Sequence, residues 1–275
     1  MNLQATIPDA LSTSAYGEEP VASHLLAVVV PVRDEAPNIP PLVAEFGTAL
    51  AGIDHEIIFV DDGSTDDSQA VLAALAKERP EIRVLRHTGS FGQSAAILTG
   101  VTAANAVWIA TIDGDGQNDP ADIPDMLQRA WQEERPDEPV LVAGRRVRRK
   151  DSAMKRIASR IANGVRARVL HDGVPDSGCG LKLFRRSVFL GLPRFDHMHR
   201  FLPALFASIG GRTVLHPVAH RPRVAGRSHY GTWDRLRVGI VDLAGVAWLQ
   251  RRACRPVLGA SAADAGSPAS LEVAR

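Results

Sequence analysis

Short apolar runs alternate with longer amphipathic segments along the first two thirds of the chain. The apolar runs have the length and apolar character of buried strands, and they lie near residues 25–32, 56–60, 81–86, 107–112 and 139–143. The segments between and after them are typical of helices, near residues 38–50, 67–78, 92–104, 120–133 and 152–170. This alternation predicts an α/β fold built on a largely parallel, doubly wound sheet.

Two carboxylates and a carboxamide follow directly after one of these runs, in the sequence Asp113-Gly114-Asp115-Gly116-Gln117. The glycines allow the backbone to turn sharply there. Oxygen ligands of this kind suit Mg²⁺ or Mn²⁺, which takes a few protein oxygens and leaves other positions to phosphates and water. Asp119 and Pro120 then fit the N-cap and the first position of a helix. For an isolated motif, the alternative is an acidic turn with local hydrogen bonds.

Acidic residues also follow two earlier predicted strands. The run at 56–60 is followed by Asp61-Asp62-Gly63-Ser64-Thr65-Asp66, and the run at 25–32 by Arg33-Asp34-Glu35. In an open α/β sheet, ligands bind at the carboxyl ends of the strands. Three strands that are each followed by acidic residues at the same edge therefore predict a metal and nucleotide site. The turn Gly89-Ser90-Phe91-Gly92-Gln93 fits either a phosphate-binding turn or a plain one, because it lacks the Gly/Lys pattern of a P-loop.

Length and composition indicate one compact domain with two tails. The 275 residues are 45% hydrophobic, which is ample for a sizeable core. The two cysteines, Cys179 and Cys254, give neither a disulfide framework nor zinc spacing, which favours a reducing cytoplasm. Residues 1–23 contain no apolar segment of a signal peptide, and residues 257–275 are small and polar. We expect both tails to be disordered around a catalytic domain at 24–231.

The net charge of +1 hides a strong asymmetry between the two halves of the chain. Residues 1–140 carry 7 Lys and Arg against 23 Asp and Glu, whereas residues 141–275 carry 25 against 8. The acidic half fits a metal-nucleotide site, and the basic half predicts an anionic partner such as a nucleic acid, an anionic lipid or a phosphorylated substrate. Nucleic-acid binding is disfavoured because no zinc-finger, RNP-like or KH-like motif occurs and the basic half is poor in stacking aromatics.

The order of motifs resembles the family 2 glycosyltransferases of the GT-A fold. Within that family it is similar to the polyprenyl-phosphate group, typified by dolichol-phosphate mannosyltransferase and bacterial undecaprenyl-phosphate sugar transferases. The resemblance covers about residues 25–250 and rests on five motifs in family order: VVVPVRDE, FVDDGSTDDS, IDGDGQNDP, DSGCGLKLFRR and HRPRVAGRSHYG. It implies a single GT-A type nucleotide-diphospho-sugar transferase domain.

The resemblance also implies a donor site and a metal site. Pro31, Asp34 and Glu35 would flank the base and ribose of the nucleotide, and Asp62 would also contact the base. Asp113 and Asp115 would hold the donor diphosphate through Mg²⁺ or Mn²⁺, with Gln117 as a further ligand. The metal would neutralise charge on the departing nucleoside diphosphate. Asp34 stands where many family members have Asn.

Basic residues of the second half fit an acceptor phosphate, because guanidinium groups match phosphate oxygens. The resemblance assigns this role to Arg146, Lys182, Arg223, Ser228 and His229. His229 departs from the lysine that is usual in the motif, and histidine is only partly charged near neutral pH. Arg148, Arg149 and Lys150 fit an ordinary solvated surface.

A phosphomonoester is already largely ionised at neutral pH, so it needs less help from a general base than a sugar hydroxyl would. Asp176, which precedes the Ser-Gly-Cys-Gly sequence, is the first candidate for a catalytic base, ahead of His197 and His199. For either histidine a structural role is the alternative. The family implies inversion at the anomeric carbon.

The segment 232–256 bears on localisation. Its apolar run Val238–Leu249 spans about 12 residues and is interrupted by Asp242, against roughly 20 needed to cross a bilayer. Tryptophans and arginines at its ends fit an amphipathic helix that lies in the membrane interface, with a core helix or an oligomer contact as the alternative. We therefore expect a peripheral protein on the cytoplasmic face of the membrane.

Taken together, the sequence predicts a metal-dependent enzyme that moves a sugar from a nucleotide sugar, of the GDP-mannose or UDP-hexose type, to a polyprenyl phosphate. Two alternatives stay open: a transferase of the same fold with a sugar-hydroxyl acceptor in cell-envelope polysaccharide synthesis, and a nucleic-acid or acidic-lipid binding module. The intact Glu35, Asp113 and Asp115 argue against the binding module.

Overall fold

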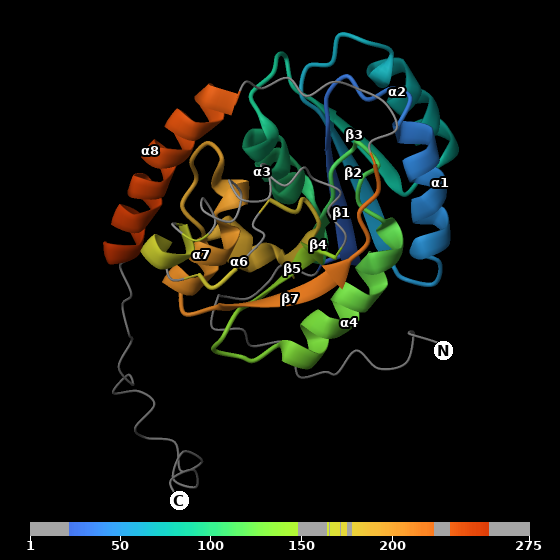
Figure 1. Cartoon of the computed structure of the whole chain (residues 1–275). Helices are drawn as coiled ribbons and strands as arrows, with labels where there is room; N and C mark the ends of the chain where they lie inside the picture. The colour runs from blue at the N-terminus through green and yellow to red at the C-terminus, as the bar shows by residue number, and fades with distance from the viewer. Residues whose placement is uncertain are drawn as a thin grey trace, which may run out of the picture.

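The computed structural model describes residues 22–147, 164, 166–170, 172–174, 178–222 and 232–252. Its centre is a seven-stranded sheet with helices on both faces, shown in Figure 1. The strand order is β3-β2-β1-β4-β6-β5-β7. The strands are β1 (His24–Val32), β2 (His55–Asp61), β3 (Ile82–Arg86), β4 (Ala106–Thr111), β5 (Val140–Arg146), β6 (Lys182–Arg185) and β7 (Arg212–Val218).

The sheet is parallel except for one strand. β3, β2, β1 and β4 form parallel pairs, β5 and β7 form another, and β6 runs antiparallel to both of its neighbours, β4 and β5. The predicted doubly wound, mostly parallel α/β sheet is therefore confirmed. Because β2, β1 and β4 are adjacent and parallel, their carboxyl ends meet at one edge, as the sequence predicts for the three acidic turns.

Alternate side chains of the central strands enter two separate hydrophobic cores. On β1, Leu26, Val28 and Val30 face one core, and Ala27 and Val29 face the other. The first core is covered by α1 (Ile39–Ala49), α2 (Ser68–Glu78) and α4 (Ile123–Glu133). The second is covered by α3 (Gln93–Ala103), α6 (Arg186–Leu190) and α7 (Leu202–Ser208). Because helices cover both faces of the sheet, the side chains on both sides of such strands are buried, and the strands are apolar along their whole length.

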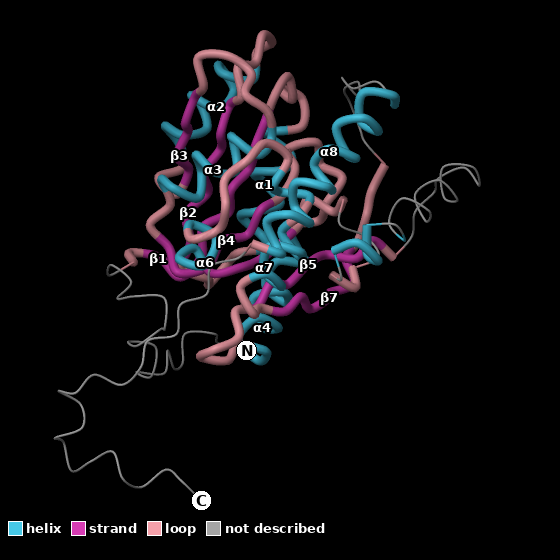
Figure 2. Tube along the Cα trace, turned by 90° about the vertical axis from the view of Figure 1, so that its left-hand side faces the viewer, coloured by secondary structure: helices cyan, strands magenta, loops and turns pink. Residues whose placement is uncertain are grey.

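The last helix, α8 (Thr232–Arg251), lies outside α7, beside it in both Figure 1 and Figure 2. Val246 of α8 is fully buried in the second core, and the Gln250 side chain donates hydrogen bonds to the carbonyls of Leu170 and Ala204. Within the described segments, no helix has both the length and the apolar character that a bilayer crossing requires.

Sequence patterns located the elements of the first half well and missed several of the second. The five predicted strands and the first three helices agree with the structure within a few residues. The predicted helix 120–133 divides into the 3-10 turn η2 (Pro120–Asp122) and α4. The elements that the sequence did not predict are β6, β7, α6, α7 and the 3-10 turn η3 (Met198–Arg200). Of the predicted helix 152–170, the described residues 164 and 166–170 are helical.

Candidate functional site

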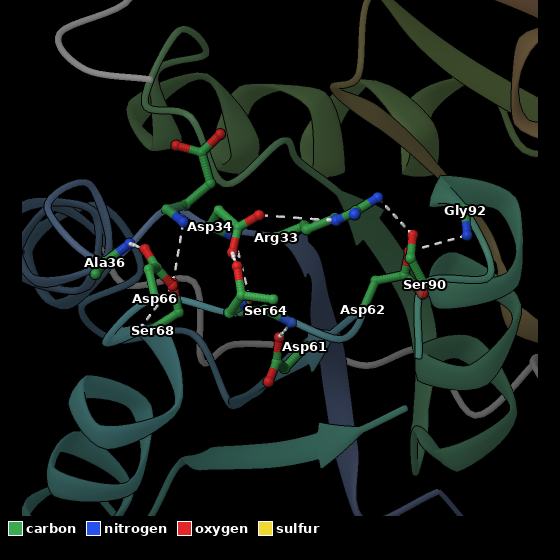
Figure 3. A network of polar contacts seen from close by, with 12 residues as sticks. Arg33, Asp34, Ala36, Asp61, Asp62, Ser64, Asp66, Ser68, Ser90 and Gly92 are labelled. Carbon is green, nitrogen blue, oxygen red and sulfur yellow. Dashed lines mark hydrogen bonds and ion pairs between the residues drawn. The ribbon is translucent and has the colours of Figure 1, made fainter. Parts of the chain in front are cut away.

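The loop after β1 and the loop after β2 are tied together by hydrogen bonds, as Figure 3 shows. The Asp34 N–H donates to Ser64 Oγ (3.0 Å), and the Thr65 N–H donates to Asp34 Oδ1 (2.7 Å). The Glu35 N–H donates to Ser68 Oγ at 3.0 Å. Asp34 adopts a positive φ of 55°, which Asp tolerates better than most residues. These bonds fix the backbone that carries the predicted donor residues Asp34 and Glu35.

Asp62 organises the turn between β3 and α3. Its carboxylate accepts hydrogen bonds from the N–H groups of Phe91 and Gly92 and from Ser90 Oγ, each at 2.9 Å, and pairs with His87 Nδ1 at 2.7 Å. Burial opposes ionisation, but these bonds outweigh it and hold the pKa of Asp62 below its ordinary value. The glycine-containing turn, for which the sequence left two readings open, is thus held by a carboxylate of the neighbouring strand.

Asp113 lies at the centre of the site, at the end of β4. Its Oδ1 accepts a 2.7 Å hydrogen bond from Gln93 Nε2, at the first residue of α3. The side chain keeps partial exposure, but surrounding protein and the nearby charge of Asp115 raise the pKa of Asp113 to about 6. The positive charges of Lys182 and Arg146 act in the opposite direction on the same group. Two carboxylates that repel each other favour a cation between them.

Asp115 and Gln117 share the loop that follows. Asp115 is buried and accepts a hydrogen bond from the Gln117 N–H at 3.1 Å. The side-chain N–H of Gln117 donates a hydrogen bond to the Arg221 carbonyl at 3.4 Å. The amide oxygen is not used in this bond and can bind a hard cation. Among the described residues, no three His, Cys, Asp or Glu side chains gather as a metal cluster. Two carboxylates and one amide are the oxygen ligands that Mg²⁺ and Mn²⁺ accept together with phosphate and water.

Two of the predicted acceptor residues lie at the same edge. Lys182 begins β6, where it pairs with Thr111 of β4 and Ala143 of β5, and its buried ammonium donates to the Cys179 carbonyl. Arg146 ends β5. Lys182 thus lies opposite a residue two positions before Asp113, and the charges of Lys182 and Arg146 both oppose the rise in the pKa of Asp113. The other predicted residues of the acceptor side, Asp176, Arg223, Ser228 and His229, lie outside the described residues.

The two candidate histidines have different surroundings. His199 Nδ1 lies 2.7 Å from Ser94 Oγ, next to Gln93 on α3. Burial, assisted by Lys182, Arg200 and His197, lowers the pKa of His199 well below its ordinary value, so the ring is neutral near pH 7. His197 instead faces α8, where its Nδ1 lies 3.0 Å from Asp242.

Sequence reasoning missed the residues that support the site. Gln93 was visible in the Gly-Ser-Phe-Gly-Gln turn, and Gly180 and Arg221 stand inside the motifs already singled out, without an assigned role. Pro31, which the sequence did predict, lies close to Gly114: a Cβ atom added to this glycine would come within 3.1 Å of the Pro31 carbonyl. Glu35 accepts a hydrogen bond from Asn38. The contacts of Gln93, Gly180 and Arg221 do not follow from spacing in the sequence, because each joins segments that are far apart in the chain.

Comparison with known proteins identifies relatives of the chain. The model of glycosyl transferase family 2 matches residues 27–191. A dodecaprenyl-phosphate galacturonate synthase of Rhizobium johnstonii is 36% identical over 243 residues, covering 86% of this chain and 71% of that protein. An undecaprenyl-phosphate 4-deoxy-4-formamido-L-arabinose transferase of Sodalis glossinidius is 32% identical over 215 residues, covering 77% of this chain. This chain covers 64% of that transferase, which is less than two thirds of its length.

Solved structures are similar in fold. Glucosyl-3-phosphoglycerate synthase of Mycobacterium tuberculosis superposes with a TM-score of 0.59 over 85% of this chain and 82% of that one, at 17% identity. That structure contains Mn²⁺, UDP and glucosyl-3-phosphoglycerate. At this identity the likeness concerns the fold alone.

Proposed function

The chain belongs to glycosyl transferase family 2, and from this membership we propose that it transfers a sugar from a nucleotide-sugar donor to the phosphate of a polyprenyl phosphate. Its fold is the GT-A arrangement that the resemblance implied. The observation that carries the proposal is the meeting of opposite charges at one strand edge. Asp113 follows β4 there, Lys182 begins the neighbouring β6 and Arg146 ends β5, so a metal-diphosphate site would adjoin a site for a second anion.

On the donor side, Asp113, Asp115 and Gln117 would hold Mg²⁺ or Mn²⁺. When bound, the metal would offset the charge that develops on the departing nucleoside diphosphate. The hydrogen bond from Gln93 holds the Asp113 carboxylate in place, and the Gln117 N–H does the same for Asp115. The tied loops after β1 and β2 would form the base and ribose site through Pro31, Asp34, Glu35 and Asp62. Rigid placement lowers the entropy lost when the donor binds.

On the acceptor side, Lys182 and Arg146, with Arg223, Ser228 and His229, would bind and orient the lipid phosphate. A phosphate monoester is already ionised at neutral pH, so its oxygen can attack the anomeric carbon with little assistance from a base. Asp176 would be the base if one is needed. His199 is neutral, and if its Nδ1 accepts from Ser94 Oγ, its Nε2 would carry the proton and could donate a hydrogen bond. Inversion at the anomeric carbon would follow from a single displacement.

The acceptor's lipid chain places the reaction at a membrane, so we include peripheral association with the inner face of the cytoplasmic membrane. α8 supports this assignment because Ile240, Val241 and Trp248 are exposed on it. Arg251 and Arg252 at its end are also exposed and fit the anionic lipids of that leaflet.

The test is transfer by the purified full chain. UDP- and GDP-sugars are supplied with Mn²⁺ and a short-chain polyprenyl phosphate, and the matching polyprenol serves as the acceptor without phosphate. We expect a glycosylated product with the phosphate acceptor alone, and none for Asp115→Ala. Arg223→Ala should lower kcat/KM for the acceptor roughly tenfold to hundredfold, with donor affinity unchanged.

Four outcomes would contradict the proposal. Transfer to the polyprenol or to a sugar hydroxyl at the same rate would favour the sugar-hydroxyl alternative. Full activity in the presence of EDTA would show that transfer needs no metal. Equal acceptor kinetics for Arg223→Ala and the wild type, or tight RNA binding that is lost in Arg223→Ala, would exclude the lipid phosphate as the partner of the basic residues.

A further inference from the structure

The segment that follows β7 lies against the loop that carries the predicted metal ligands. The Arg221 N–H donates to the Gln117 carbonyl at 2.8 Å, and the Gln117 amide nitrogen donates to the Arg221 carbonyl at 3.4 Å. Asn118 and His220 form an antiparallel bridge beside this pair. Two segments separated by about a hundred residues therefore behave locally as a short strand pair. We call this pairing of residues 117–118 with residues 220–221 the clasp.

The Arg221 side chain fastens the clasp to the rest of the domain. One guanidinium nitrogen lies 2.7 Å from Glu45 of α1, and the other pairs with Asp119, just beyond Gln117. The hydrogen bond from Arg221, together with the Ala121 N–H, outweighs burial and lowers the pKa of Asp119. One planar group thus joins α1, the metal loop and the segment after β7, an arrangement that the forked guanidinium permits and a lysine ammonium does not.

We propose that Arg221 is a positioning residue that holds the Gln117 side chain in place as a metal ligand. The inference rests on the proposed function, because it assumes that Gln117 binds the metal. The clasp would fix the metal loop against the segment after β7, and the two ion pairs of Arg221 would keep the clasp closed.

The main chain of Arg221 contacts the side chain of the predicted metal ligand Gln117 directly. The Arg221 carbonyl accepts from the amide nitrogen of Gln117, which fixes the orientation of that amide and assigns its oxygen to the metal. Arg221→Ala keeps this carbonyl but removes the two ion pairs that hold it against the metal loop, and loss of such outer contacts typically lowers metal affinity by about tenfold or more. A salt bridge that only stabilised the fold would lower the melting temperature and leave the metal titration unchanged.

The first experiment needs no acceptor. The thermal shift of the full chain is measured with UDP and with GDP while Mn²⁺ is titrated. We expect Arg221→Ala to raise the Mn²⁺ concentration at half-maximal shift about tenfold. Arg221→Lys should recover part of this loss because lysine can pair with one carboxylate. Arg129→Ala is the matched control, since Arg129 forms a 2.7 Å ion pair with Glu133 on α4, away from the clasp. It should not move the midpoint.

The second experiment measures transfer to the polyprenyl phosphate. Arg221→Ala should raise the metal requirement of transfer, whereas Arg223→Ala should raise the KM of the acceptor alone. If Arg221→Ala does not fold, Glu45→Gln carries the test, because it removes one ion pair of Arg221 and leaves the Asp119 pair in place. It should move the Mn²⁺ midpoint in the same direction by a smaller factor.

The outcomes separate this inference from the proposed function. A wild-type chain that binds neither nucleotide in the presence of Mn²⁺ would overturn both. If the wild type binds and Arg221→Ala has the same Mn²⁺ midpoint, the positioning role is wrong and the proposed function stands. If the midpoint shifts but polyprenyl phosphate is not an acceptor, the coupling to Gln117 is supported and the proposed acceptor is wrong.

Discussion

Gly180 lies directly against the carboxylate of Asp113. A Cβ atom at position 180 would come within 2.2 Å of Asp113 Oδ2, and it would meet the other carboxylate oxygen at 2.4 Å. Thr111 fixes this contact from the neighbouring strand, since its Oγ1 donates to the Gly180 carbonyl at 2.8 Å. A glycine is therefore required here by the close approach of a backbone to a functional side chain, rather than by an unusual φ angle.

Gly180→Ala should displace Asp113 and abolish metal-dependent binding of nucleotide. The cost to the free energy of unfolding should be about 1–3 kcal/mol, because the added methyl group overpacks the site. Gly245→Ala is the matched control: a Cβ atom at this helical position of α8 meets nothing within 4 Å, so this variant should be as stable as the wild type or more so. Thermal unfolding with and without UDP and Mn²⁺ measures both effects. If Gly180→Ala bound UDP with Mn²⁺ as tightly as the wild type, a displaced Asp113 would still support nucleotide binding.

Asp113→Asn should stabilise the metal-free protein at neutral pH while it removes metal binding. Because the pKa of Asp113 is raised to about 6 in the folded state, the folded state holds this proton more tightly than the unfolded chain does. The contribution of Asp113 to stability is thus lost as the pH rises from about 4 to 6. Its partial exposure reduces the effect, so we expect the variant to gain roughly 1–3 kcal/mol over the wild type across this window.

Urea unfolding in EDTA at pH 4 and at pH 7.5 checks this expectation. The difference in the free energy of unfolding between Asp113→Asn and the wild type should be larger at pH 7.5 than at pH 4. A difference that is the same at both values would mean that the Asp113 carboxyl titrates normally in the folded protein.

Asp62→Ala should destabilise the protein and weaken nucleotide binding at the same time. The substitution leaves the N–H groups of Phe91 and Gly92 without their acceptor, at a cost of roughly 2–3 kcal/mol. Asp67→Ala is the control, since Asp67 is exposed at the start of α2 and its side chain caps no N–H group. Chemical denaturation and nucleotide titration measure the two effects. Loss of binding with unchanged stability would instead assign Asp62 to the base alone.

How far sequence patterns predicted this fold depended on where the stabilising contacts lie. Each strand of the first half is a continuous apolar run, because helices cover both faces of the sheet, and such runs are visible without tertiary information. β6 has four residues, begins with Lys182 and ends with Arg185, whose guanidinium lies over the Trp108 ring. A short strand with charged ends carries no alternation from which it could be predicted.

The candidate site was also predictable from the sequence only in part. The carboxylates of Asp62, Asp113 and Asp115 could be placed at one edge because parallel strands must end together. The partners that hold them could not, since Gln93 reaches Asp113 from the start of α3 and the Phe91 and Gly92 N–H groups reach Asp62 from another turn. Long-range hydrogen bonds of this kind depend on how helices and loops are laid over the sheet, which a single sequence does not reveal.

The membrane assignment of α8 is best tested with a substitution on its exposed face. Deletion of residues 233–275 would be a weaker test, because it would also remove the buried Val246 and the hydrogen bonds of Gln250 to the domain. Trp248 is 60% exposed, so Trp248→Ala should leave the melting temperature nearly unchanged.

If α8 lies in the membrane interface, Trp248→Ala should reduce co-sedimentation with anionic vesicles, because the loss of a large aromatic anchor weakens partitioning by about tenfold or more. Trp131→Ala is the matched control, since Trp131 is partly exposed on α4, which covers the opposite face of the sheet. Its co-sedimentation should equal that of the wild type. Equal binding by Trp248→Ala and the wild type would place the membrane contact on another surface, and a loss in Trp131→Ala alone would place it near α4.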